Sequence, residues 1–431
     1  MENIIHYISK QLKKKAMDDT VIAMYEKEGK QLKFVDNKVV KTGFELASNI
    51  SIFCSKNKKI IYTSLKDISK SKADELIKKI NVFSKDIHPN NDYYGIAKGP
   101  FKYKEKIDYD KNIMNINESD LLEKGMNKAL ENSKRVSGNL EVWHLKMHLV
   151  TSNHVDAVDY SSNLYFSIRA FNEMDESGHM TCCSNTLRNF SIEKTAERAA
   201  EIATLAKKPK EIESGKYPVI FSHMAFAPLL NNISDAASIY NVESGFSFLN
   251  ELNKNYGNFT LEDDATLPNG FNSCKFDEEG VPTERTTIID KGILKTYLHN
   301  TSTATEYKTK TTANAGLIAP RSFNIVFDCK KGDIFDVKEG IYITNVWYTR
   351  FQNYANGDFS TIPRDGAFLI KNGKIVQSLK GLRISDNMLN LLKNIKCCNK
   401  KVLQIKSWEA ETPAFTPEVL IDNVNITKPE H

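Results

Sequence analysis

Histidines are the side chains of this sequence best suited to bind a metal or move a proton near neutral pH, and there are nine. His144 and His148 are four residues apart, which on a helix would place both rings on one face. Apolar and polar residues alternate around them, however, and this pattern predicts a strand with both rings on its polar side. We therefore predict a structural role for this pair. His179 in a Ser-Gly-His turn, His223 after a strand and His299 at the end of a hairpin strand are weaker candidates, for which a hydrogen-bonded edge histidine is the simpler interpretation.

The other reactive residues form no recognised catalytic pattern. The seven cysteines are odd in number and scattered, and no C-x-x-C spacing occurs, so neither a disulfide framework nor a cysteine zinc site is indicated. The sequence contains no G-x-S-x-G elbow, P-loop, G-x-G-x-x-G or H-E-x-x-H motif. Acidic clusters at 262–264 and 277–279 lack the spacing of a calcium loop, and we predict that they are solvated turns.

Charge and hydropathy argue against several classes of protein. The chain has 59 basic and 54 acidic residues, and a net charge of +5 spread along its length does not indicate nucleic-acid binding. No uncharged apolar stretch approaches the roughly 20 residues of a membrane span. Residues 1–15 lack the apolar core of a signal peptide. With the unpaired cysteines, these features predict a cytoplasmic protein.

The elements that must position these residues change in character along the chain. Turn-forming residues near 88–100 and at 208–216 mark two boundaries. We therefore predict three segments: an α/β region at 1–95, a second α/β region at 96–212, and a larger β-rich domain at 213–431. The expected fold class is mixed α/β, or α+β.

Short strands and amphipathic helices alternate in the first two segments. The predicted strands are 21–26, 32–35, 51–55, 59–63, 143–149 and 164–171. The predicted helices begin at Ser69 or Ser71, after Ser119, and at Ser191. In the third segment we predict mostly strands, with hairpins at 286–298 and 367–379 and one helix at 226–240.

Several motifs in the third segment occur in the order known from one protein family. Residues 277–283 (DEEGVPT) and 292–299 (GILKTYLH) resemble the D-x-E-G-V-P-T and G-x-L-x-x-Y-L-H motifs of the TldD/PmbA metalloproteases. Residues 357–360 (GDFS) and 370–375 (IKNGKI) resemble the family's G-D-F-S and I-x-N-G-x-I. The upstream regions fit in order and length, so the likeness covers most of the chain.

This resemblance implies an α/β amino-terminal region followed by a larger β-rich domain. It also implies cytoplasmic dimers, in which a TldD chain commonly pairs with a TldE (PmbA) chain, and proteolysis of peptides. In catalytic members an H-E-x-x-x-H helix and a later cysteine hold zinc. Water polarised by the metal, with the glutamate as base, attacks the peptide carbonyl.

The sequence departs from the family at that helix. Residues 227–236 read APLLNNISDA, and placing the two leucines as in the family puts Asn231, Asn232 and Ala236 where His, Glu and His belong. Asparagine is a poor zinc ligand and alanine is none. The resemblance therefore implies a degenerate motif, with no metal or catalytic residue in this chain and zinc in a partner.

We interpret the chain as a TldE-like subunit that completes a dimer with a TldD-like catalytic chain and contacts its peptide substrate. Pairing of the chain with itself stays open. The candidate cleft contacts, chosen because cationic donors can hold a carboxylate or carbonyl, are Arg285, His299, Arg350 and Arg364. Two alternatives are an autonomous zinc peptidase, with ligands such as His179, His299 and Cys274, and a non-enzymatic binding module.

Overall fold

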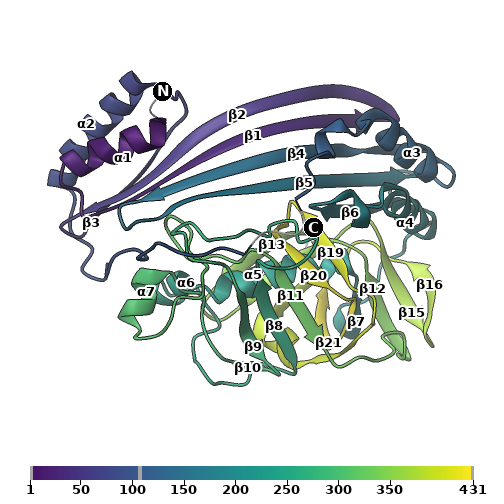
Figure 1. The fold of residues 1–431 in the computed structure, drawn as a ribbon. Coiled ribbons are helices and arrows are strands. Elements are labelled where there is room, and N and C mark those ends of the chain that lie inside the picture. Colours follow the sequence, from purple (N-terminus) through teal and green to yellow (C-terminus); the bar gives the residue numbers. More distant parts are fainter. Residues whose placement is uncertain (1–2, 105–108, 429–431) are drawn as a thin grey trace.

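A long, curved, six-stranded antiparallel sheet dominates the first half of the chain (Figure 1). The structure is a computed structural model and describes residues 3–104 and 109–428. Across the sheet the order is β3-β2-β1-β4-β5-β6. The strands are β1 (Asp19–Val35), β2 (Lys38–Lys56), β3 (Lys59–Leu65), β4 (Arg135–Thr151), β5 (Asp156–Phe171) and β6 (Ser177–Ser184). Four of them run for 16 to 19 residues, so single strands connect the two ends of the sheet.

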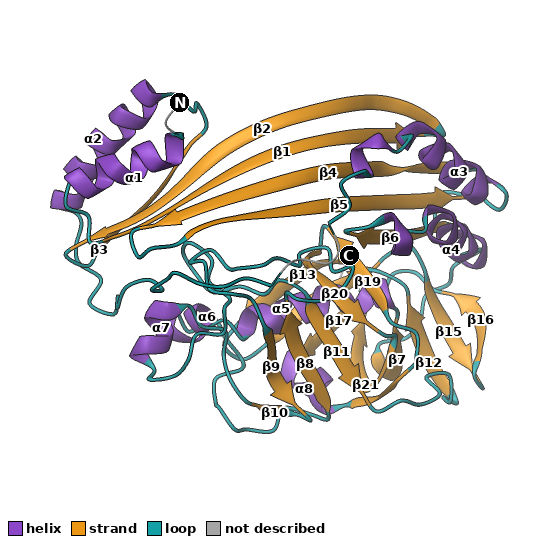
Figure 2. Ribbon diagram, viewed as in Figure 1, coloured by secondary structure: helices purple, strands orange, loops and turns teal. Residues whose placement is uncertain are grey.

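Two pairs of helices cover one face of this sheet at its opposite ends (Figure 2). They are α1 (Ile4–Lys14) with α2 (Lys70–Asp86), and α3 (Glu118–Leu130) with α4 (Ile192–Leu205). Ile5 and Ile8 of α1 pack in one core with Ile22 of β1. Because side chains alternate along a strand, the neighbouring residue Val21 points to the other face, where it packs with Phe276 from the second half of the chain.

Two further sheets form the second half, below the long sheet in Figure 1. One has the order β10-β9-β8-β11-β20-β19, and the other β13-β14-β17-β21-β7-β12-β15-β16, with β18 paired to β21. The strands of the first are β8 (Phe259–Asp264), β9 (Arg285–Asp290), β10 (Ile293–Leu294), β11 (Ile325–Cys329), β19 (Leu403–Ser407) and β20 (Ala410–Thr416). Those of the second are β7 (Gly215–Phe221), β12 (Glu339–Ile343), β13 (Val346–Asn353), β14 (Asp358–Pro363), β15 (Ala367–Lys371), β16 (Lys374–Ser378), β17 (Arg383–Asn387), β18 (Ile395–Cys398) and β21 (Val419–Thr427).

The helix α5 (His223–Ala236) contacts strands of both of these sheets. It packs against β7 and β13 of one and β11, β19 and β20 of the other. The remaining helical segments are short: α6 (Ile239–Glu243), α7 (Thr301–Glu306), α8 (Met388–Lys393), η1 (Ile113–Asn115) and η2 (Leu187–Asn189). Within the described residues no helix is both long enough and apolar enough to cross a lipid bilayer.

The predicted fold class is confirmed, with an α/β front half and a β-rich second half. The boundary placed between residues 95 and 96 lies in the loop before η1, and strands from both sides of it join one sheet. The boundary at 212 lies just before β7, while the outer limits 1 and 431 fall outside the described residues. The division into three domains stays a prediction.

Several predicted elements differ from the structure. The segments 21–26 and 32–35 are parts of the single strand β1, because its polar middle is hydrogen-bonded to β2 on one side and β4 on the other. His179 is not in a turn but lies in β6, and His223 is the first residue of α5. The predicted helix at 226–240 starts earlier and is interrupted before Ile239.

Candidate functional site

The helix α5 is capped at its start and buried along nearly its whole length. The hydroxyl of Ser222 accepts a hydrogen bond from the N–H of Ala225 at 3.3 Å and donates one to the carbonyl of Thr344 at 2.7 Å. This cap satisfies an N–H of the first turn and ties the helix to the end of β12. Polar side chains farther along α5 must therefore find partners inside the protein.

The side chain of Asn231 forms hydrogen bonds with β20 and with its own helix. Its side-chain nitrogen donates to the carbonyl oxygens of Thr412 at 2.9 Å and Ala227 at 3.1 Å, and its oxygen accepts from the N–H of Thr412 at 2.9 Å. Asn232 donates to the carbonyl of Pro228 at 2.8 Å, and Ala236 offers only a methyl group. Two hydrogen-bonded carboxamides and a methyl group do not fit a zinc ion, which takes thiolate, imidazole or carboxylate ligands.

A groove of about 580 Å³ lies between the long sheet and the second half of the chain. We call it the sheet groove. Its lining includes Trp143 of β4, Tyr165 of β5, Trp347 of β13 and Trp408 from the turn between β19 and β20. Glu411 also lines the groove, and the next residue, Thr412, is hydrogen-bonded to Asn231 of α5.

Two guanidinium groups contact one indole ring in the sheet groove. Arg169 lies 4.7 Å and Arg364 4.3 Å from the ring centroid of Trp347, within the range of a cation–π contact. Arg169 also pairs with the buried carboxylate of Asp365 at 3.0 Å. The Nε of Arg169 is buried and has no hydrogen-bond partner among the described residues. Because buried donors are normally satisfied, this N–H is an exception among the polar atoms beside the groove.

Ser167, His179 and Asn345 form a hydrogen-bonded row beside the groove. The Nε2 of His179 lies 3.0 Å from the Ser167 hydroxyl, and its Nδ1 lies 3.1 Å from the side-chain nitrogen of Asn345. Because an amide nitrogen only donates, Nδ1 accepts and Nε2 carries the proton. Burial lowers the pKa of His179 to about 4. A neutral ring whose proton already points to Ser167 does not remove the hydroxyl proton, so this row is not arranged as a serine nucleophile.

The turn between β19 and β20 is anchored to a bulge in β13. The backbone of Tyr348 has a φ of +56°, and at this bulge the N–H groups of Tyr348 and Thr349 both point to Glu409. They donate to its carboxylate at 3.1 and 3.0 Å. The anchor holds Trp408 edge-on against Trp347, with 5.7 Å between the ring centroids. The aromatic wall of the sheet groove is therefore built from two segments fixed to each other.

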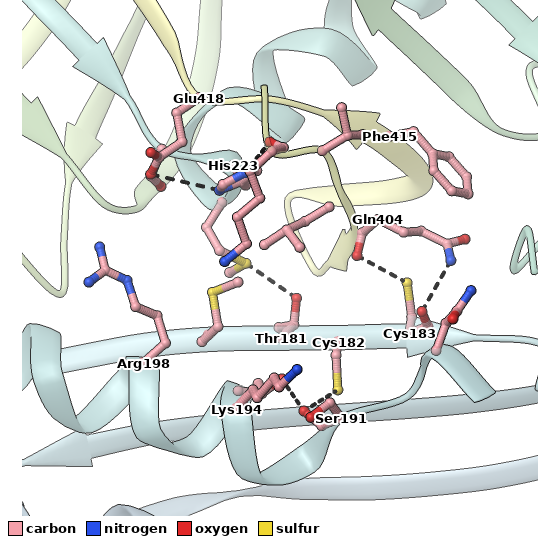
Figure 3. A pocket seen from close by; sticks show the side chains of 18 of the residues that line it. Thr181, Cys182, Cys183, Ser191, Lys194, Arg198, His223, Gln404, Phe415 and Glu418 are labelled. Atoms are coloured by element: carbon pink, nitrogen blue, oxygen red, sulfur yellow. Dashed lines mark hydrogen bonds and ion pairs between the residues drawn. The ribbon is translucent and has the colours of Figure 1, made fainter. Parts of the chain in front are cut away.

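A second, larger cavity of about 870 Å³ lies between α4, β6 and the start of α5 (Figure 3). The Nδ1 of His223 is 3.7 Å from Glu418, whose carboxylate accepts a hydrogen bond from Tyr342 at 2.7 Å. Arg198 donates to the same phenolic oxygen at 2.9 Å. Burial raises the pKa of the Cys182 thiol to about 12, so this thiol does not act as a nucleophile at neutral pH. The polar groups of His223, Glu418, Tyr342 and Arg198 are paired with one another, and we assign no reaction to this cavity.

None of the four predicted cleft contacts is among the residues that line the sheet groove. Arg364 stacks on Trp347, which does line it, and Arg350 lies over the ring of Tyr348, the next residue of β13. Their role as cleft contacts stays a prediction. Arg285 instead forms an ion pair with Glu262 of the neighbouring strand β8. His299 is only 3% exposed, and burial lowers its pKa to about 4. The structure thus separates Arg285 and His299 from the groove lining.

The alternative ligand set His179, His299 and Cys274 is not brought together. In the part of the chain that the structure describes, one group of His, Cys, Asp or Glu residues holds three ligand atoms within 4.8 Å of one another. It consists of His6, His148 and Asp156. An autonomous peptidase built on the alternative set therefore has no support in the geometry.

The sequence analysis did not single out Ser167, Arg169 or Asn345. Ser167 and Arg169 alternate with buried Phe166 and Ile168 along β5. This period-two pattern predicts that both polar side chains lie on one face of the strand. Asn345 joins them from a segment some 180 residues away, and no local pattern reports such a contact.

Similar proteins are known. Residues 214–428 match the family model described as the PmbA/TldA metallopeptidase C-terminal domain. The chain is 30% identical over 299 residues to an uncharacterized protein of Methanocaldococcus jannaschii, covering 66% of this chain and 70% of that protein. It is 31% identical over 257 residues to a metalloprotease of the same organism, covering 52% and 54%. The crystal structure of TldE from Thermococcus kodakarensis has the same fold, with a TM-score of 0.85 at 21% identity over 99% of each chain.

Proposed function

Because the chain belongs to the PmbA/TldD metallopeptidase family, we propose that it is the non-catalytic, TldE-like subunit of a heterodimeric peptidase. In this proposal a TldD-like partner holds the zinc ion and the catalytic glutamate. This chain completes the dimer and supplies contacts to the peptide. Both subunits work in the cytoplasm.

The side chains of α5 carry the proposal. A zinc peptidase needs ligands with free lone pairs and a base that reaches the metal-bound water. The carboxamide of Asn231 uses both of its polar atoms on Ala227 and Thr412, and that of Asn232 bonds within the helix. With Ala236 at the third position, the three motif positions of α5 offer neither a ligand set nor a base.

The outer half of β2 supports the presence of a partner chain. Among the described residues, 38–49 pair only with β1, whereas Ile50–Lys56 also pair with β3. An open edge strand presents a row of unpaired backbone groups to a second chain. Phe44 and Leu46 lie opposite Lys30 and Glu28 of β1, so they share one face of this edge, and both are exposed, Leu46 by 73%. A partner that covers these apolar side chains would remove them from water.

The sheet groove supports contact with a peptide. Its volume of about 580 Å³ suits a few peptide residues rather than a folded domain. Trp347 and Trp408 offer aromatic surface for side chains, and Arg364 offers N–H donors for a carbonyl or carboxylate. These contacts would position a substrate without themselves cleaving it.

Co-expression tests the proposal. The chain is purified alone and together with a TldD-type chain from the same genome, and each sample is analysed by size-exclusion chromatography with light scattering. We expect an equimolar complex that hydrolyses unstructured peptides, and a lone chain that does not. Hydrolysis by the lone chain that is blocked by a chelator would overturn the proposal.

A further inference from the structure

Two histidines and a carboxylate converge where α1 meets the hairpin of β4 and β5. The Nε2 of His6 lies 2.9 Å from one carboxylate oxygen of Asp156, and the Nε2 of His148 lies 2.8 Å from the other. The two imidazole rings meet edge-on, with 5.6 Å between their centroids. The helix α1 and the two strands of the hairpin therefore direct their ligand atoms at one point, and all three atoms lie within 4.8 Å of one another.

We propose that His6, His148 and Asp156 bind one divalent transition-metal ion, with Zn²⁺ as the ion best suited to the site. Two imidazole nitrogens and one carboxylate oxygen form a ligand set that zinc takes in proteins, whereas Mg²⁺ and Ca²⁺ require mostly oxygen ligands. None of these residues belongs to α5 or lines the sheet groove. The proposal is therefore independent of the non-catalytic role proposed above.

The spacing of the ligands is close to what zinc requires. With bonds of about 2.0–2.1 Å, a tetrahedral zinc ion holds its ligand atoms about 3.4 Å apart. The nitrogens of His6 and His148 lie 2.9 and 2.8 Å from different oxygens of Asp156, so the carboxylate must rotate for one oxygen to serve the ion together with both rings. His6 and Asp156 are 43% and 58% exposed, so their side chains are free to adjust. The exposed side of the cluster leaves the fourth position to water.

The neighbouring His144 shows why the cluster forms at His148. Both lie on the same face of β4, but the Nε2 of His144 is hydrogen-bonded to the carbonyl of Asp110 at 3.0 Å. Its ring packs against Tyr109, with 5.3 Å between the centroids. His148 is 12% exposed and faces the carboxylate of Asp156 instead. The structural role predicted from sequence therefore fits His144, while the surroundings of His148 suit a ligand.

Metal binding changes one hydrogen bond near the site. The Nδ1 of His148 is 3.4 Å from the side-chain nitrogen of Asn3. The side-chain oxygen of Asn3 accepts a hydrogen bond from Ile5 and caps α1. Coordination through Nε2 places the ring proton on Nδ1, so this long contact is given up. In return the metal fastens α1 to a hairpin about 140 residues away in sequence. We expect bound zinc to stabilise the folded chain, because the unfolded chain does not preassemble the site.

The experiment measures zinc binding to the full chain after treatment with a chelator. Wild type, His6→Gln, His148→Gln and Asp156→Asn are titrated with Zn²⁺ by calorimetry, and each melting temperature is recorded with and without zinc. His88→Gln, at an exposed loop position, is the matched control. We expect each of the three site variants to bind one zinc equivalent fewer than wild type and to lose the zinc-dependent rise in melting temperature. We expect His88→Gln to behave as wild type, and Mg²⁺ to give no signal.

The proposal would be overturned if wild type and Asp156→Asn bound the same number of zinc ions and showed the same zinc-dependent rise in melting temperature. The three residues would then be a hydrogen-bonded His–Asp–His cluster that binds no metal. Asp156→Asn keeps the shape of the side chain, and His6 lies on an exposed part of α1. Melting temperatures in chelator show directly whether a variant folds. Neither the zinc stoichiometry nor the melting temperature depends on peptide hydrolysis. A negative result here therefore leaves the proposed function untouched, and failure of the proposed function leaves the zinc site untouched.

Discussion

Asn231 and Thr412 exchange two hydrogen bonds that join α5 to β20. The side-chain nitrogen of Asn231 donates to the carbonyl of Thr412, and its oxygen accepts from the N–H of Thr412, both at 2.9 Å. The position at which catalytic relatives are expected to carry a zinc ligand is thus part of the internal packing of this chain. Both polar atoms of its side chain are used inside the protein.

Replacing Asn231 by Ala should destabilise the fold more than replacing Asn232. The first change leaves the N–H and carbonyl of Thr412 without their partner, at a cost of about 1–3 kcal/mol. The side chain of Asn232 bonds only to the carbonyl of Pro228 one turn earlier, and alanine is the better helix former, so its loss should cost less than about 1 kcal/mol. Urea unfolding followed by circular dichroism measures both, and equal losses would contradict this account of Asn231.

Replacing Arg364 by Ala should weaken substrate binding by the complex. The guanidinium stacks on Trp347 at 4.3 Å and lies in no catalytic centre. We therefore expect KM for peptides to rise severalfold while kcat changes little, the pattern of lost uniform binding. Arg285→Ala is the control, because Arg285 pairs with Glu262 and does not stack on Trp347. A fall in kcat at unchanged KM would argue against a positioning role for Arg364.

A lysine at Leu46 should prevent assembly with the partner. The side chain is 73% exposed on the open edge of β2, so Leu46→Lys should leave the lone chain folded while burying a charge in any interface formed there. Val376→Lys, on the edge strand β16, is the matched control. Light scattering of co-expressed samples should show the complex for the control and separate chains for Leu46→Lys. An intact complex with Leu46→Lys would place the interface elsewhere.

The buried His179 should make the stability of the fold depend on pH. The folded pKa of His179 is about 4, against about 6.5 in an unfolded chain. Between these values the unfolded chain binds a proton that the folded ring does not, so His179 reduces stability as the pH falls from about 6.5 to 4. His179→Gln lacks the titrating ring and does not lose this stability. As the pH falls through that range, the difference in free energy of unfolding between wild type and the variant should therefore shrink by about 1.4 kcal/mol per pH unit. Urea unfolding at several pH values tests this, and a deficit independent of pH would contradict it.

Local signals predicted the start of α2 and the tight turn between β15 and β16. The side chain of Ser69 caps α2, and Asn372 and Gly373 form the turn between β15 and β16 with positive φ values, as an Asn-Gly pair favours. The full length of β1 could not be predicted, because Lys27 to Gln31 is polar and is held only by pairing with β2 and β4. Long-range pairing overrides local preference at such a strand.

The candidate site was predictable only in part. Asn231, Asn232 and Ala236 lie on one continuous helix, as the placement of the motif requires, and their correspondence to the zinc ligands of the family stays a prediction. The groove row of Ser167, His179 and Asn345 joins three strands or loops, and only the folded chain brings these side chains together. The convergence of distant elements is set by sheet order and register, which hydrophobic patterning does not specify.

The central claim, that this chain is the non-catalytic half of a peptidase, is tested most directly by the rate of peptide hydrolysis in matched samples. These are the lone chain, the lone TldD-type partner, their complex, and a complex in which the glutamate of the partner's zinc motif is replaced by glutamine. The account predicts hydrolysis by the complex with the intact partner and none by the lone chain or by the complex with the altered partner. Hydrolysis by the lone chain, or activity that survives loss of the partner's glutamate, would contradict it.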